Sequence, residues 1–423
     1  MSIIHELVKD IPLPKMVKIR QTFDRTQIED VPQAVWAELS QERIRARIKP
    51  GMRICITAGS RGIDRLREFE KTIVDFVKDC GAEPFIIPAM GSHGGCSAEG
   101  QREILEGYGV TEEYCGCPII SQMETKTICM TPDGHPVKID RCAAEADGII
   151  VFNRVKPHTH FRGRYESGIM KMMTIGLGKQ EGAESAHDTG ILHLAEVVET
   201  FGNAVRTHAN VLIALASVEN AYDKCCRVVA MTNEEIPEVE PELLEYARSR
   251  MPRIVIPESD LLLVDEIGKN FSGPGADPNV TGTFSNTWTH GGHKKQRMVF
   301  FDLSKESHGN ASGLGLADFT TRRLVEKMDP EPGYANSITS ICIEEGKIPI
   351  VCESQADAIK AGVRACTDID RSAVRIIRIH NTLHLDELYI SESLLEEAGK
   401  YPEIEILSQP EPFAFDGDGN LFA

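Results

Sequence analysis

Residues 147–187 have the sequence DGIIVFNRVKPHTHFRGRYESGIMKMMTIGLGKQEGAESAH. Its opening run, DGIIVFN, is apolar between polar residues, a pattern typical of a buried strand that ends in a loop. Residues 157–187 then bring together three histidines, two lysines and five glycines. The carboxyl end of a strand is the usual ligand edge of an open α/β sheet. We therefore expect the functional residues of the chain in this stretch.

Strand patterns followed by helical patterns recur on both sides of this stretch. The predicted strands are Met52–Gly59, Pro84–Met90, Asp147–Asn153, Val211–Val218, Asp260–Gly268, Arg297–Leu303, Ser337–Ile343 and Val374–Ile379. Apolar residues three to four positions apart predict helices between most of them. This alternation favours an α/β fold built from mainly parallel, doubly wound sheets.

The chain of 423 residues is long enough for two domains, each with its own core. Residues 269–296 are rich in Gly, Pro, Asn and Thr, and a loop of that length is usually functional or a domain joint. We expect an N-terminal catalytic and cofactor-binding domain over residues 1–268. A smaller α/β domain is expected over residues 297–423, with a turn-rich tail able to return to the first domain. The expected active site is the cleft between the two domains.

The formal net charge of −18 argues against nucleic acid or a membrane surface as a partner, because both are anionic. No segment resembles a signal peptide or supplies the ~20 apolar residues that span a bilayer, so we expect a cytoplasmic protein. The twelve cysteines contain no paired C-x-x-C, which indicates neither a disulfide framework nor a zinc knuckle. Whether the chain forms a homo-oligomer is left open.

Two further side chains follow predicted strands. Arg61 comes after the strand at Met52–Gly59, and His93 lies in the sequence GSHGG after Pro84–Met90. If the strands are parallel, both residues share one sheet edge with the 157–187 stretch. The alternatives are an arginine that closes a turn and a histidine that caps the following helix.

Small residues surround the two lysines of the 157–187 stretch. Gly168 lies just ahead of Lys171, and Gly176-Leu177-Gly178-Lys179 follows. Such residues let backbone N–H groups approach an anion, although the spacing of a P-loop is absent. The alternatives are a plain turn at Lys179 and, for Lys171, a lysine at the edge of a buried segment.

The stretch resembles the lactate racemase family, which uses a nickel-pincer nucleotide cofactor. In that family a lysine is joined to the cofactor through a thioamide, and a histidine sixteen residues downstream binds nickel. Lys171 and His187 have this separation. The resemblance therefore implies that His187 is the metal ligand. Lys171 and the glycine-rich segment around it are expected to bind the cofactor. The expected cofactor-binding residues are Lys171, Gly168, Gly176, Gly178 and Lys179.

The resemblance also implies two acid/base histidines and an arginine that holds the substrate. His160, in His-Phe-Arg-Gly, fits the histidine that precedes the lysine, with one residue inserted, and His158 is the rival for this role. His93, in Gly-Ser-His-Gly, matches the histidine of a Gly-Thr-His-Arg-like loop. Arg61 matches the arginine of an early turn, in which Ala58 replaces an acidic residue.

By this resemblance the chain is expected to be a nickel-dependent racemase or epimerase of an α-hydroxy acid, lactate-like or a larger sugar acid. A hydride would leave C2 for the cofactor and return, while the histidines move the hydroxyl proton. The expected partners are a small 2-hydroxy acid and the enzymes that mature the cofactor. Two alternatives remain: a zinc-dependent hydrolase with His158, His160 and His187 as ligands, and a non-enzymatic small-anion-binding protein.

Overall fold

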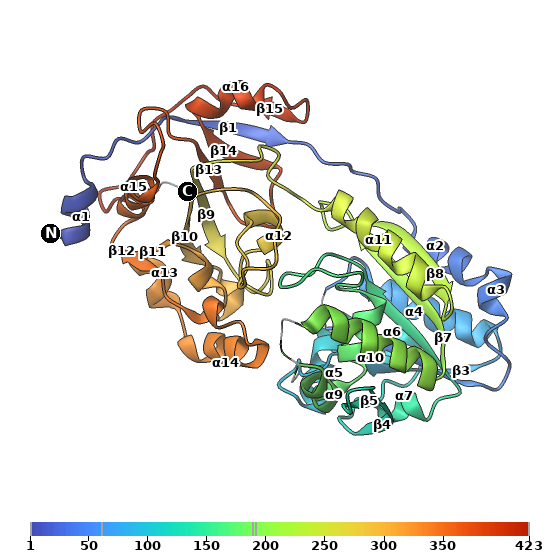
Figure 1. Cartoon of the computed structure of the whole chain (residues 1–423). Coiled ribbons are helices and arrows are strands. Elements are labelled where there is room, and N and C mark those ends of the chain that lie inside the picture. Colours follow the sequence, from blue (N-terminus) through green and yellow to red (C-terminus); the bar gives the residue numbers. More distant parts are fainter. Residues whose placement is uncertain (1, 61, 188–189, 191–192, 422–423) are drawn as a thin grey trace. The chain divides into compact units, whose positions relative to one another are not determined.

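The structure, a computed structural model, describes residues 2–60, 62–187, 190 and 193–421. It divides into two compact units (Figure 1). One unit is Asp24–Met251, called here the 24–251 unit. The other combines Met1–Phe23 with Pro252–Ala423 and is called the C-terminal unit. Each unit is built around one large sheet.

The 24–251 unit contains a five-stranded sheet with the order β3-β2-β6-β7-β8. Its strands are β2 (Arg53–Ala58), β3 (Glu83–Pro88), β6 (Gly148–Arg154), β7 (Val211–Glu219) and β8 (Cys225–Thr232). The first four in spatial order run parallel, and β8 pairs antiparallel with β7. The carboxyl ends of β2, β3 and β6 therefore lie at one edge of the sheet.

Helices cover both faces of this sheet (Figure 1). They are α2 (Val31–Leu39), α3 (Glu42–Arg45), α4 (Leu66–Asp79), α5 (Ala98–Gly107), α6 (Glu112–Cys115), α7 (Arg141–Ala144), α8 (Ile169–Lys171), η1 (Met172–Gly176), α9 (Lys179–His187), α10 (Leu194–His208) and α11 (Ile236–Arg250).

Alternate residues of the strands enter two different cores. On β2, Ile54 and Ile56 join the core that contains α2 and α4, whereas Cys55 joins the core that contains α10 and α11. A two-stranded hairpin, β4 (Thr125–Met130) and β5 (Pro136–Asp140), adds Val137 and Ile139 to the second core. The predicted α/β class with a mainly parallel, doubly wound sheet is confirmed here.

The C-terminal unit contains an eight-stranded sheet with the order β12-β11-β10-β9-β13-β14-β1-β15. Its strands are β1 (Met16–Gln21), β9 (Leu261–Ile267), β10 (Arg297–Leu303), β11 (Phe319–Thr321), β12 (Ile350–Cys352), β13 (Ile376–Ile379), β14 (Glu387–Ser391) and β15 (Ile404–Ile406). Neighbours from β12 to β13 are parallel, and those from β13 to β15 are antiparallel.

The helices of this unit are α1 (Ile3–Val8), α12 (Pro278–Thr281), η3 (Lys305–Ser307), η4 (Leu314–Leu316), α13 (Arg322–Lys327), α14 (Pro330–Ser340), η5 (Ile343–Gly346), α15 (Gln355–Ala365), η6 (Glu392–Leu394) and α16 (Leu395–Ala398). Within the described residues no helix has the length and apolar character needed to cross a membrane. All twelve cysteines are free thiols.

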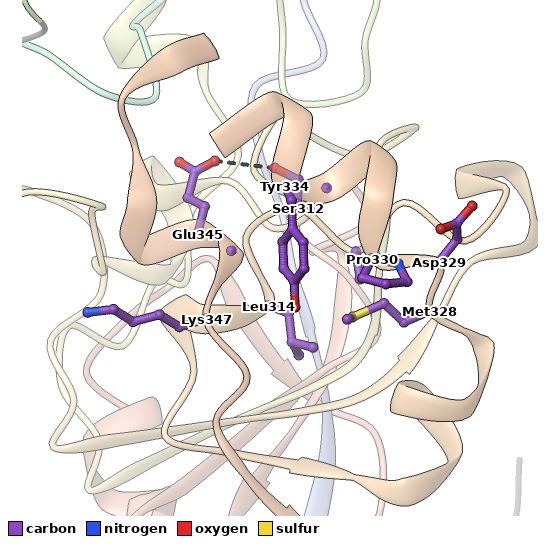
Figure 2. A pocket seen from close by; sticks show the side chains of 11 residues that line it. Ser312, Leu314, Met328, Asp329, Pro330, Tyr334, Glu345 and Lys347 are labelled. Atoms are coloured by element: carbon purple, nitrogen blue, oxygen red, sulfur yellow. Dashed lines mark hydrogen bonds between the residues drawn. The ribbon is translucent and has the colours of Figure 1, made fainter. Parts of the chain in front are cut away.

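A pocket lies beside α14 in the C-terminal unit (Figure 2). The Tyr334 ring lies in it between Lys347 on one side and Met328 on the other. Ser312 Oγ donates a hydrogen bond of 3.4 Å to Glu345 Oε2 at its upper side. No histidine lines this pocket as the described residues define it, so it lacks the groups expected for acid/base chemistry near neutral pH.

The predicted division at residue 268 differs from the observed units. Residues 1–23 and 252–268 lie with the C-terminal unit, because β1 pairs with β14 and β9 pairs with β10 and β13. Strand patterns show that a segment is extended, but not which sheet completes its hydrogen bonds. The predicted strand at 337–343 is also wrong, because α14 and η5 occupy it. Asp329 caps α14, and Pro330 occupies its first turn.

A fragment of residues 24–251 should fold when produced alone, because all five strands of its sheet and both cores lie within it. A fragment of residues 1–268 should aggregate or expose apolar surface, because β1 and β9 would lack their sheet partners. Thermal unfolding followed by circular dichroism checks this. A 24–251 fragment without a cooperative transition would contradict the observed division.

Candidate functional site

Three loops follow the parallel strands β2, β3 and β6 in the 24–251 unit. Ser60 follows β2, and its Oγ lies 2.5 Å from Nδ1 of His93, in the loop after β3. Asn153, at the end of β6, donates from Nδ2 to the carbonyl oxygen of Gly168 at 2.9 Å. The sheet edge therefore gathers the segments that the sequence singles out, as expected for carboxyl ends of parallel strands.

Lys171 ends the short helix α8, and the π-helix η1 follows directly. Single turns of π-helix occur frequently at functional sites. Lys171 Nζ lies 2.5 Å from Nε2 of His158. This contact joins the lysine expected to hold a cofactor to one of the two histidines considered for acid/base work.

His158 has defined surroundings on each side of its ring. Its Nδ1 accepts a hydrogen bond of 3.1 Å from the backbone N–H of His160. Removal of the ring from water is the main cause that holds the pKa of His158 well below its usual value, and the positive charges of Lys156 and Arg162 act in the same direction. His158 is therefore neutral near pH 7.

His160 lies beside this pair rather than in it. Its Nδ1 is 2.8 Å from Thr159 Oγ1, and its ring centroid lies 5.4 Å from that of His158. Among the contacts described for the two histidines, the one with Lys171 belongs to His158. The geometry therefore favours the rival assignment, in which His158 is the histidine next to the lysine.

Glu166 holds the loop that carries His158. Its buried carboxylate accepts hydrogen bonds from the backbone N–H of His158 at 2.6 Å and of Gly163 at 3.4 Å. It is ion-paired with Arg248 of α11 and, at 3.5 Å, with Arg162. A buried carboxylate with this many partners fixes the backbone on which His158 is mounted.

Glu240, also on α11, holds the start of α8. Its buried carboxylate accepts the backbone N–H of Met170 at 3.0 Å. A Cβ built on Gly168 would lie 2.1 Å from Glu240 Oε1, so glycine is required there to admit the carboxylate. Burial raises the pKa of Glu240 to about 8, and the backbone hydrogen bonds oppose this shift.

Glu166, Arg248 and Glu240 were not predicted from the sequence as site residues. Glu240 and Arg248 lie on a helix far along the chain from Lys171, and nothing in the local pattern shows which loop they meet. One available signal was Gly168 itself, because a glycine just before a helix often marks a close approach.

Glu240→Gln should remove a pH-dependent part of the stability. The Glu240 carboxyl keeps its proton in the folded state up to about pH 8, whereas an unfolded glutamate releases it near about pH 4.3. Its contribution is therefore complete below the lower value and is lost as pH rises through the upper one. The melting temperature of the wild type, minus that of the variant, should fall between about pH 5 and pH 8.5.

Glu242→Gln is the matched control, because Glu242 is exposed on the same helix. The melting temperature of the wild type, minus that of Glu242→Gln, should stay constant over the same pH range. A Glu240→Gln difference that stays constant across the same pH range would show that the carboxyl does not carry its proton into the folded state.

Lys179 is fully buried, and its Nζ is held by three internal acceptors. They are the carbonyl oxygen of Pro88 at 2.6 Å, Gln101 Oε1 at 3.2 Å and Asp140 Oδ2 at 3.2 Å. Burial lowers the pKa of Lys179, and Asp140 opposes the shift. These contacts support the structural interpretation of Lys179 over phosphate binding.

Gly176 and Gly178 lie in close packing. A Cβ on Gly176 would lie 2.7 Å from the carbonyl oxygen of Ala89, and one on Gly178 would lie 2.9 Å from Cα of Gly182. The carbonyl oxygen of Gly176 accepts a hydrogen bond of 3.2 Å from the backbone N–H of Gly91, which joins η1 to the loop of His93. Close approach of segments therefore accounts for both glycines.

Two of the expected site residues lie wholly or partly outside the described structure. Arg61 falls outside the described residues. His187 is the last residue of α9, and its side chain is likewise outside the description. The zinc alternative, with His158, His160 and His187 as ligands, gains no support, because Lys171 and a backbone N–H engage the two ring nitrogens of His158.

Residues 9–198 match the family model described as the lactate racemase N-terminal domain. The curated proteins compared with the chain include no match. A solved structure, the lactate racemase apoprotein from Thermoanaerobacterium thermosaccharolyticum, matches with a TM-score of 0.45 and 13% identity, covering 68% of this chain and 74% of that chain. The matched residues 9–198 contain His93, His158, Lys171 and His187. The resemblance drawn from the motifs is confirmed, and the chain carries a domain of the lactate racemase family.

Proposed function

We propose that the protein is a racemase or epimerase that inverts C2 of a 2-hydroxy acid. The family match supports a racemase-type function. The observation that carries the proposal is the contact between Lys171 and the neutral His158, within the matched residues. It combines an amine for covalent attachment with an imidazole able to move a proton.

Positive charge around His158 supports an anionic substrate. Lys156 and Arg162 are both close enough to lower the pKa of His158. This group of positive side chains is a local exception in a chain with a net charge of −18, and its charge attracts a carboxylate or a phosphate. In the proposal Arg61 holds the substrate carboxylate, since a guanidinium can bind it through two parallel hydrogen bonds.

The proposed cofactor is a nickel-pincer nucleotide, with Lys171 as its covalent anchor and His187 as the protein ligand of nickel. One imidazole together with soft sulfur donors suits nickel(II). The contacts of Lys171 fit this group, because the amine faces a neutral imidazole. When bound, the cofactor would take the hydrogen of C2 as a hydride and return it. Lys179, held by internal acceptors, is left out of the phosphate site.

The acid/base work is proposed for His93 and His158. One histidine would take the hydroxyl proton while the C2 hydrogen leaves as a hydride, and the two losses together give a planar 2-keto acid. The other histidine would supply the hydroxyl proton when the hydride returns to the opposite face. His93 is exposed and touches Ser60, so it is open to solvent and to a ligand. His158 replaces His160 in this role because it contacts Lys171.

The proposed substrate is lactate-like or a larger sugar acid, and the proposed location is the cytoplasm. The cofactor would be delivered by separate maturation enzymes. A non-enzymatic anion-binding protein would also use the positive charges, but it would have no need for the contact between Lys171 and His158.

Protein produced together with the maturation enzymes should contain nickel and a covalent mass adduct on the peptide that includes Lys171. Lys171→Ala should abolish the adduct, whereas His187→Ala should lower nickel retention and keep more of the adduct. Metal analysis and peptide mass spectrometry measure both. An unmodified Lys171 in active, nickel-containing protein would refute the anchor.

His93→Ala and His158→Ala should each lower kcat for both enantiomers by ~10²-fold or more, since each histidine acts as base in one direction and acid in the other. His160→Ala is the matched comparison and should lower kcat by a smaller factor. Deuterium at C2 should stay in the product, because a transferred hydride does not exchange with water. Rapid loss of that deuterium to solvent would contradict hydride transfer and show direct abstraction of the C2 proton.

A further inference from the structure

The protons shared by His160, His158 and Lys171 can be counted from their contacts. The backbone N–H of His160 points at Nδ1 of His158, at 3.1 Å. A backbone amide nitrogen acts only as a donor, so Nδ1 of His158 is an acceptor and carries no proton. An imidazole with one unprotonated nitrogen keeps its proton on the other. That proton is therefore on Nε2 of His158.

Nε2 of His158 is the atom that faces Lys171 Nζ, at 2.5 Å. An N–H donor needs a lone pair on its acceptor, and an ammonium group has none. We propose that His158 holds Lys171 as a neutral, nucleophilic amine before any cofactor is present. The purpose of this arrangement rests on the proposed function, in which Lys171 is the covalent anchor, but the count of protons does not. The count describes the cofactor-free protein, and the acid/base role proposed for His158 applies after Lys171 has been acylated.

The surroundings favour the same state. Lys156 and Arg162 are close enough to act on His158, and a further positive charge on Lys171 would add repulsion among these groups.

A neutral Lys171 can attack an activated carboxyl or thiocarboxyl carbon directly. The bond from Nζ to carbon forms, the leaving group departs with its electron pair, and one amine proton passes to water. An ordinary lysine has only on the order of 10⁻³ to 10⁻⁴ of its amine in the neutral form at pH 7. The ligand class assigned to the position is therefore an acyl or thioacyl donor.

Trace acetylation of the cofactor-free protein with a water-soluble N-hydroxysuccinimide ester tests the proposal. Peptide mass spectrometry gives the rate at Lys171 and at the exposed Lys126, each at about pH 7 and about pH 10. The ratio of the two rates for one lysine cancels its steric shielding. The rate at Lys126 should rise by ~10²-fold or more, and the rate at Lys171 by less than ~10-fold. An equally steep rise at both lysines would overturn the proposal.

Variants of the two histidines sharpen the test. His158→Phe keeps a ring beside Phe161 but has no donor, so the steep pH dependence of Lys171 should return. His158→Gln has an amide N–H and should restore part of the flat profile. His160→Phe is the matched control, because it keeps the backbone N–H that His158 accepts. A flat profile in His158→Phe would show that another group keeps Lys171 neutral.

The wild-type ratio decides the proposal even where a variant fails to fold. Failure of this proposal can also be distinguished from failure of the proposed function. A steep wild-type profile contradicts the neutral amine but leaves cofactor attachment open. A flat profile in a protein that never carries the adduct contradicts the proposed function and leaves the neutral amine in place.

Discussion

The hydrogen bond between Lys171 and His158 depends on two backbone positions that are fixed from a distance. Glu240 holds the start of α8, which carries Lys171, and Glu166 holds the loop of His158. Both carboxylates are buried, and α11 supplies Glu240 and the Arg248 that pairs with Glu166. A buried polar group left without its hydrogen bonds costs about 1–3 kcal/mol, so neither position can shift freely. This rigidity is what places an amine against an imidazole with one defined proton.

The sheet edge at this site could be predicted from the sequence, because its causes are local. Apolar runs that end at polar residues predicted the strands before Ser60, His93 and Asn153, and parallel pairing brings their ends together. The spacing of Lys171 and the surrounding histidines indicated the lactate racemase family, which the match over residues 9–198 confirms. The sequence pattern predicted the position of a side chain wherever that position depends on a single strand or helix.

Contacts between segments distant in the chain could not be predicted in the same way. The histidine beside Lys171 depends on how the 157–168 loop folds over α8, and spacing alone favoured His160 over His158. Glu240 resembles any other acidic residue of a helix until its contact with Met170 is known. Likewise, the partners of β9 lie in β10 and β13, so its apolar run did not reveal the sheet to which it belongs.

The central claim is that His158 is a neutral imidazole protonated on Nε2 and directed at a neutral Lys171. Nitrogen NMR of protein labelled with ¹⁵N-histidine measures this directly, with the His158 signals assigned by comparison with His158→Gln. The account predicts, at neutral pH, one protonated nitrogen at Nε2 and an unprotonated Nδ1 that shares a hydrogen bond with the backbone of His160. An imidazolium protonated on both nitrogens, or a proton on Nδ1 alone, would contradict it.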